Sequence, residues 1–166
     1  AIQGAMKTRG IRRVISFHNR VKSAERFSSD VPAIAKWLRK SGKPTPEDIW
    51  SEAVSGEMRV VDREAILKRL VDLEDGACGV VSNARCLGEG VDVPAIDGIA
   101  FVDPKNSTID IVQAVGRAIR SSKNKVETST VILPVPILDR DDPTETLESS
   151  SFKAVWRVLE ALRAHD

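Results

Sequence analysis

The sequence has few of the residues that bind metals or form disulfide bridges. It contains two cysteines, Cys78 and Cys86, and two histidines, His18 and His165, with no Cys-x-x-Cys pair. A zinc site or a disulfide framework is therefore not expected, and we predict no metal ligands. The cysteines are interpreted as small buried or half-buried residues of a protein in a reducing compartment.

The sequence also lacks long apolar runs. No stretch approaches the roughly 18 consecutive apolar residues that a transmembrane helix needs, and no secretory-signal pattern opens the chain. Internal repeats and low-complexity tracts are absent as well. We therefore expect no membrane partner and a cytoplasmic protein.

Charge is unevenly distributed, although the net charge of the 166 residues is only +1. Residues 1–40 hold ten bases and two acids, whereas residues 139–148 hold five acids and one base. A polyanion would approach the basic N-terminal part. The acidic segment, residues 139–150, is interpreted as a loop or linker.

Short strand-like runs alternate with helical periods along most of the chain. The strand-like runs are residues 12–17, 49–54, 78–83, 98–103 and 129–137. Such alternation predicts an α/β domain with a mostly parallel central sheet and helices on both faces. The length suits one domain.

The helices are expected between and after these runs. One begins near Asn19, and a second spans residues 32–40 with Trp37 turned inward. Residues 60–73 form a covering helix that Asp62 is expected to cap.

Two further helices are expected in the C-terminal half. In residues 106–122, Ser107 and Asp110 resemble a capping box, and an apolar stripe follows at Val112, Val115 and Ile119. Residues 151–166 form an amphipathic helix that packs on the domain or leads into a further one. Its apolar stripe is Phe152, Val155, Trp156, Leu159 and Leu162.

Polar loops follow the strand-like runs, at the edge where parallel α/β sheets bind their ligands. His18, Asn19 and Arg20 come directly after the first strand, at a helix N-terminus that suits a phosphate. The alternative is that Asn19 caps the helix and the bases are solvated. The loop after the third strand contains Glu89, Gly90 and Asp92, which suit the binding of a sugar hydroxyl. The alternative is a glycine turn before Pro94 with solvated acids. 

The helix of residues 106–122 gathers polar groups on one side. At about 100° per residue, Gln113, Arg117 and Arg120 fall within roughly 60° of one another, and Gly116 leaves room beside them. Such a face suits a phosphate or a carboxylate. The alternative is an exposed basic face, with Arg120 stabilised at the C-terminal end of the helix dipole.

These stretches together resemble a known family. GEGVDVPAID and QAVGRAIR are similar to motifs V and VI of superfamily 2 helicases, the DEAD/DEAH-like and restriction-type ATP-dependent motors, and RRVISFHNRVKSAERF resembles motif IV. The resemblance spans roughly residues 12–120, including the order of the strands. It implies that residues 1–138 form the second, RecA-like lobe of a two-lobe motor.

The resemblance also implies roles for individual residues. Arg117 and Arg120 would be arginine fingers that reach the γ-phosphate of ATP, and Gln113 would contact the nucleotide. The residues implied near the nucleotide are Glu89, Gly90, Asp92 and Gly116, and those implied along the nucleic-acid track are His18, Asn19, Arg20, Ser82 and Asn83. Two positions depart from the family: Ala114 replaces a common arginine, and Ala84 replaces a common threonine.

The sequence lacks the motifs that hold ATP itself. The only Gly-Lys pair, Gly42-Lys43, is followed by proline in a loop, and no Asp-Glu pair ends an apolar run. The resemblance therefore implies ATP and Mg²⁺ in a complete motor, held mainly by a first lobe of the same parent chain, and neither in this chain alone. The expected partner is nucleic acid, DNA more than RNA.

Two other functions remain open from the sequence. The chain could be a non-catalytic nucleic-acid-binding α/β module that uses its basic N-terminal quarter. It could also be an unrelated α/β enzyme whose phosphate-bearing substrate is clamped by Arg117 and Arg120. That enzyme would need a base or nucleophile, for which the sequence offers only Glu89, Asp92 and His18.

Overall fold

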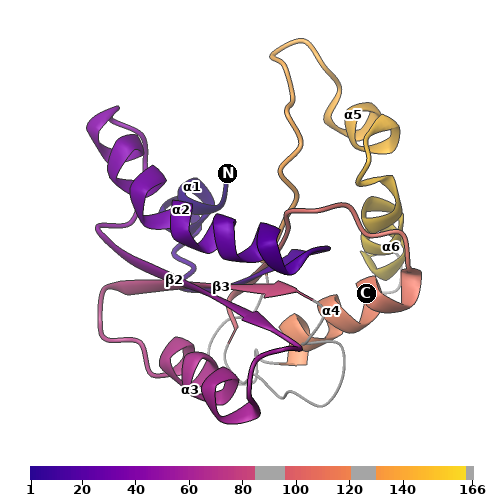
Figure 1. The fold of residues 1–166 in the computed structure, drawn as a ribbon. Helices are drawn as coiled ribbons and strands as arrows, with labels where there is room; N and C mark the ends of the chain where they lie inside the picture. Colours follow the sequence, from indigo (N-terminus) through magenta and orange to yellow (C-terminus); the bar gives the residue numbers. More distant parts are fainter. Residues whose placement is uncertain (85–95, 121–129, 164–166) are drawn as a thin grey trace.

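The central feature of the fold is a parallel five-stranded sheet (Figure 1). The computed structural model describes residues 1–84, 96–120 and 130–163, and for residues 117–120 it describes the backbone alone. In these ranges the strand order is β2-β3-β1-β4-β5, and every pairing is parallel. The strands are β1 (Arg13–His18), β2 (Asp48–Ser55), β3 (Ala77–Ala84), β4 (Gly98–Phe101) and β5 (Thr130–Ile132). The expected α/β class and parallel sheet are confirmed.

Helices cover both faces of this sheet. They are α1 (Ile2–Arg9), α2 (Val21–Lys40), α3 (Val60–Val71), α4 (Thr108–Arg120), α5 (Pro143–Ser149) and α6 (Lys153–Arg163). Helices α1 and α2 pack on one face, where Met6 and Val31 join a core cluster with Val14 and Val80 of the strands. Helices α3, α4 and α6 contribute to the cluster on the other face. The three-layer arrangement expected from the sequence is thus present.

Alternating side chains of β1 divide the core between the two faces. Val14 belongs to the cluster under α1 and α2, whereas Ile15 and Phe17 belong to the cluster under α3, α4 and α6. Strand β3 is buried along its whole length. Continuous burial of this kind is expected for a central parallel strand covered on both sides.

One long helix replaces the two helices expected between residues 19 and 40, and the inward position predicted for Trp37 is wrong. Helix α2 continues through Pro32, and Trp37 is 65% exposed. The buried positions of α2 include Ala24, Val31 and Ala35. Trp37 lies about 200° around the helix from Ala35, so the continuous register turns it toward solvent.

Two details of the other helices also differ from expectation. Helix α3 has Arg59 at its N-cap, and Asp62 instead accepts from the Arg59 guanidinium at 2.7 Å and 2.8 Å. Helix α4 buries Ile111, Ala114 and Val115 and leaves Val112 exposed. The Ser107 cap is confirmed, since its Oγ accepts from the Asp110 amide at 3.3 Å.

Two helices were not predicted at all. Helix α1 precedes the first strand, and α5 lies in residues 139–150, which were expected to be a loop or linker. Asp142 caps α5 by accepting from two backbone amides at 2.8 Å and 2.9 Å. An acidic N-cap followed by proline favours a helix start. The acidic composition of the segment was instead interpreted as typical of a loop.

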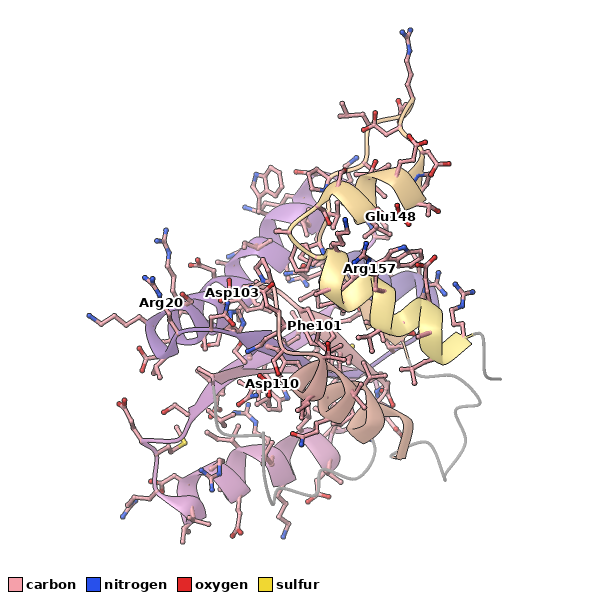
Figure 2. The ribbon with its side chains drawn as sticks, turned by 90° about the vertical axis from the view of Figure 1, so that its right-hand side faces the viewer. Arg20, Phe101, Asp103, Asp110, Glu148 and Arg157 are labelled. Atoms are coloured by element: carbon pink, nitrogen blue, oxygen red, sulfur yellow. The ribbon has the colours of Figure 1, made fainter. Side chains whose placement is uncertain are left out.

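The C-terminal helix packs against the domain. Helix α6 contacts α4 and α5, and it lies beside α4 in Figures 1 and 2. Its buried residues are Val155 and Val158, with Phe152 just before it. Leu162, expected on the same stripe, is 37% exposed.

Asp97 joins the amino-terminal ends of three strands. Its Oδ2 accepts hydrogen bonds from the backbone amides of Arg12 and Arg13, both at 2.8 Å. Its backbone accepts from Thr130 at 3.1 Å and donates to Arg13 at 2.9 Å. One residue therefore fixes β1, β4 and β5 relative to one another at this edge.

A polar chain is buried between β1 and β3. The Ser16 hydroxyl lies 3.1 Å from Nε2 of His18 and donates to the Ser82 hydroxyl over 3.1 Å. The His18 ring is 1% exposed and lies 4.9 Å from the Phe27 ring. Burial lowers the pKa of His18 below its ordinary value, against a smaller opposing effect of the Asp103 charge and with a small lowering effect of Lys105. 

The Asp97 carboxylate is expected to contribute strongly to stability. Asp97→Ala leaves the two amides without their acceptor and should lower the free energy of unfolding by about 1–3 kcal/mol. The matched control is Asp75→Ala, which removes a fully exposed carboxylate 3.7 Å from Arg12. It should leave the free energy of unfolding close to that of the unaltered chain in the same urea titration. Equal effects of the two substitutions would contradict this assignment.

The buried His18 is expected to make stability depend on pH. Its lowered pKa means that the unfolded chain takes up a proton below about pH 6.5 while the folded chain does not. The free energy of unfolding should therefore fall as the pH drops through this window, and His18→Gln should make that fall less steep. Urea titrations at pH 7.5, 6.0 and 5.0 measure both slopes. Parallel slopes would show that His18 is protonated equally in the two states.

Candidate functional site

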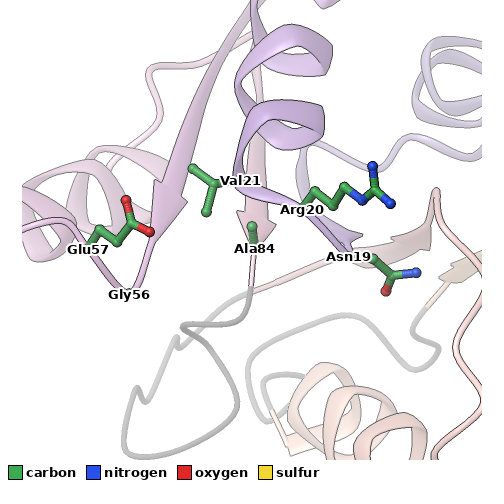
Figure 3. A pocket seen from close by; sticks show the side chains of 6 residues that line it. All are labelled: Asn19, Arg20, Val21, Gly56, Glu57 and Ala84. Carbon is green, nitrogen blue, oxygen red and sulfur yellow. The ribbon is translucent and has the colours of Figure 1, made fainter.

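All five strands point the same way, so their carboxyl ends form one edge of the sheet. A pocket of about 350 Å³ lies at this edge (Figure 3). It is lined by residues that follow β1 and β2 and by the end of β3, namely Asn19, Arg20, Val21, Gly56, Glu57 and Ala84. Of the polar loops singled out in the sequence, the one after β1 lies at this edge, and the one after β3 lies outside the described residues.

Asn19 uses its donors inside the protein. Its backbone amide donates to Oδ2 of Asp103 at 2.8 Å, and its side-chain Nδ2 donates to the Pro104 carbonyl at 3.1 Å. These contacts tie the loop after β1 to the segment after β4. Asn19 is not the cap of α2, because Arg20 is the N-cap and no side chain caps that helix.

Arg20 is exposed at the rim of the pocket and directly precedes α2. Among the described residues it has no ion-pair partner. In Figure 3 it lies on the opposite side of the pocket from Glu57. Because the first backbone amides of a helix attract anions, Arg20 and the start of α2 together favour negative charge on this side.

Three residues expected along the nucleic-acid track are instead buried. His18 and Ser82 are 1% and 0% exposed and take part in the polar chain with Ser16, and Asn83 is 3% exposed. They are strand residues whose side chains point into the packed layers, so they present no surface to a ligand. This corrects the prediction for His18, Ser82 and Asn83 as direct contacts.

Helix α4 contains the residues of the polar face predicted from the sequence. Gln113 is exposed and Gly116 is half-buried. Arg117 and Arg120 lie on the last turns of the same helix, and their side chains lie outside the described residues. Because α4 is one uninterrupted helix, Gln113, Arg117 and Arg120 keep the angular spacing of an ideal helix.

The structure gives a physical reason for Ala114, where the family often has arginine. Ala114 is 5% exposed and belongs to the core cluster that includes Phe152 and Val155. Since α6 packs against α4, a small side chain at this position leaves room for the C-terminal helix. An arginine would have to bury its charge there, which is costly.

Several predicted residues fall outside what the structure describes. Glu89, Gly90 and Asp92, expected near the nucleotide, belong to residues 85–95 and are not described. Conversely, the sequence analysis missed Glu57 and Asp103, although each follows closely after a strand. His18 and Asn19 were selected as polar residues near the end of a strand, and the same criterion would have selected Asp103.

Among the described residues, no group of three or more His, Cys, Asp or Glu side chains is placed to hold a metal ion. In the same part of the chain, no helix is long and apolar enough to cross a membrane.

Sequence comparison finds probable helicases and UvrABC system proteins. A probable helicase of African swine fever virus is 28% identical over 105 residues, which are 63% of this chain and 12% of the viral protein. UvrABC system protein B of Kosmotoga olearia is 30% identical over 110 residues, covering 63% of this chain and 14% of that protein. The chain thus spans a small part of the length of these curated relatives.

Structure comparison finds RecA-like lobes. The ATP-dependent Type ISP restriction-modification enzyme LlaBIII bound to DNA matches with a TM-score of 0.74 and 27% identity, over 98% of this chain and 11% of that one. The C-terminal domain of the DEAD-box protein Dbp5 matches with a TM-score of 0.51 and 13% identity, over 92% of this chain and 71% of that one. The RecA-like fold expected from the sequence is therefore confirmed. The helicase conserved C-terminal domain family matches residues 1–122, and the chain belongs to this family of superfamily 2 helicase C-terminal lobes.

Proposed function

We propose that the chain is the second motor lobe of an ATP-dependent nucleic-acid helicase or translocase. One observation carries the proposal: a single helix, α4, holds Gln113, Arg117 and Arg120 on one stripe and follows strand β4 at the ligand-binding edge of a parallel sheet. Two guanidinium groups on one stripe suit the charge of a transferring phosphoryl group.

The residues present fit a nucleotide shared with another lobe. Arg117 and Arg120 would act as arginine fingers toward the γ-phosphate, Gln113 would contact the nucleotide from the same helix, and Gly116 leaves space beside them. Asp92, with Glu89 and Gly90, would face the ribose. The bound ATP and Mg²⁺ would supply the phosphoryl group and its metal, and a first lobe with a Walker A motif would hold both.

Nucleic acid is the proposed partner at the same edge, and DNA is favoured. Arg20 and the start of α2 supply positive charge there. Two similar proteins of at least 25% identity are described with DNA: the LlaBIII enzyme, and the Mycobacterium smegmatis helicase Lhr bound to ssDNA and AMP-PNP, which is 26% identical with a TM-score of 0.51 over 75% of this chain and 15% of that one. We further propose a cytoplasmic location.

The arginines on α4 provide the test of the motor function. In a polypeptide that joins this chain to its Walker A lobe, Arg117→Ala and Arg120→Ala should each lower nucleic-acid-stimulated ATP hydrolysis by about 10³-fold or more, as for arginine fingers elsewhere. Arg9→Ala is the control, because Arg9 is an exposed arginine of α1 at the opposite edge of the sheet. Hydrolysis rates with single- and double-stranded DNA and RNA give the measurement.

Two outcomes would overturn this proposal. Unchanged hydrolysis in the Arg117 and Arg120 variants would show that these arginines are not fingers. Binding of nucleic acid by the parent polypeptide without any stimulated hydrolysis would instead favour the non-catalytic binding module.

Arg20 is expected to contribute to nucleic-acid affinity without sequence preference. Arg20→Ala removes one phosphate contact, so it should weaken binding about equally for different sequences and reduce the salt slope of log affinity by about one. Fluorescence anisotropy with labelled oligonucleotides between 50 and 200 mM salt would measure both. The Arg9→Ala variant should keep the unaltered slope. A sequence-dependent loss would mean that Arg20 reads bases.

A further inference from the structure

We propose that Asp103 is a positioning residue that ties the loop carrying Arg20 to the segment entering α4. Through this tie, nucleic acid held beside Arg20 would set the position of the arginines on α4. The inference rests on the proposed function, because it concerns how the nucleic-acid side of the site is linked to the nucleotide side.

The tie consists of four hydrogen bonds between the ends of two neighbouring strands. Asp103 accepts from the Asn19 amide at 2.8 Å, and Asn19 Nδ2 donates to the Pro104 carbonyl at 3.1 Å. In the opposite direction, the amides of Val102 and Asp103 both donate to the Phe17 carbonyl, at 3.2 Å and 3.3 Å. The two loops therefore interlock rather than touch at one point.

Asn19 and Asp103 lie close in sequence to the groups that they would connect. Asn19 immediately precedes Arg20, and α2 begins at the next residue. Asp103 lies five positions before the start of α4 at Thr108. In the view of Figure 2, Asp103 lies between Arg20 and Asp110 of α4.

Pro104 makes the short connection to α4 stiffer. Its ring fixes one backbone angle, and it restricts the residue before it, Asp103, to extended conformations. A displacement of the loop after β1 would therefore also displace the start of α4. The bond from Asn19 to the Asp103 carboxylate is charge-assisted, which makes it the strongest single link.

The side-chain hydrogen bonds of the tie are exposed to solvent, so their role in positioning the loops can be distinguished from a role in the stability of the fold. The hydrogen bonds made by Asn19 are exposed, whereas those of Asp97 at the other end of the sheet are partly buried. Loss of an exposed hydrogen bond costs the fold little, because water replaces the missing partner. Asp103 should therefore affect the relative position of the two loops more than the stability of the domain.

The experiment compares Asp103→Ala with Asp103→Asn in the polypeptide that contains both lobes. Alanine removes the acceptor, whereas asparagine removes the charge and keeps an oxygen in place. We measure ATP hydrolysis with and without a saturating single-stranded oligonucleotide, together with urea unfolding. Asp30→Ala is the control, because Asp30 is an exposed carboxylate of α2 that lies 3.8 Å from Arg26.

We expect Asp103→Ala to lower the ratio of stimulated to unstimulated hydrolysis by about tenfold, which corresponds to about 1.4 kcal/mol of activation free energy. The oligonucleotide affinity should change less than twofold. Asp103→Asn should recover most of the ratio, and both variants should unfold like Asp30→Ala.

Four results would overturn the inference: an unchanged ratio in Asp103→Ala, an equal loss in Asp103→Asn, a loss of stability that accounts for the lower rate, or a lower rate with the ratio preserved. The Arg117→Ala variant is measured alongside. If Arg117→Ala and Asp103→Ala both hydrolyse ATP like the unaltered protein, the proposed function fails. If Arg117→Ala loses hydrolysis and Asp103→Ala behaves like the unaltered protein, only the positioning role of Asp103 fails.

Discussion

The parallel pairing of β1 with β3 and β4 is the constraint on which the rest of the domain depends. It places one covered strand at the centre, so that the helices must bury both faces, and it collects the carboxyl ends of the strands at one edge. Aspartates lie at both ends of the β1–β4 pair. Asp97 accepts from two amides at the amino-terminal edge, and Asp103 accepts from Asn19 at the carboxyl-terminal edge. The first sets the register of the sheet and the second sets the geometry of its loops.

The fold was predictable because its main signal is repeated along the chain. Alternating strand-like and helical segments indicate a parallel α/β sheet whichever single element is misjudged. Individual helix faces were less predictable. The register of α2 depends on its continuing through Pro32, and that continuity alone decides that Trp37 faces solvent. Helix α5 was not predicted, because the charge composition of the segment was given more weight than the N-cap that Asp142 supplies.

The candidate site was predicted in part. The polar stripe of α4 follows from helix geometry, so Gln113 could be placed on it from the sequence. The difference between Arg20 and His18 could not be seen, because adjacent polar residues at a strand end can point outward or into the sheet. Ser16, two residues earlier, supplies the partner that keeps the His18 ring inside. Hydrogen-bond partners that are distant in sequence, such as Asp103 for Asn19, can be identified only once the pairing of the strands is known.

The strand order also has a consequence for how the chain acquires its structure during synthesis. Strand β1 is made before its register partners, which are Gly79 and Val80 on one side and Gly98 and Ile99 on the other. The central strand therefore stays unpaired until β3 has been synthesised. Such long-range pairing slows folding and exposes strand edges to aggregation in the interval. The helices α1 and α2, made on either side of β1, are the elements available early to cover it.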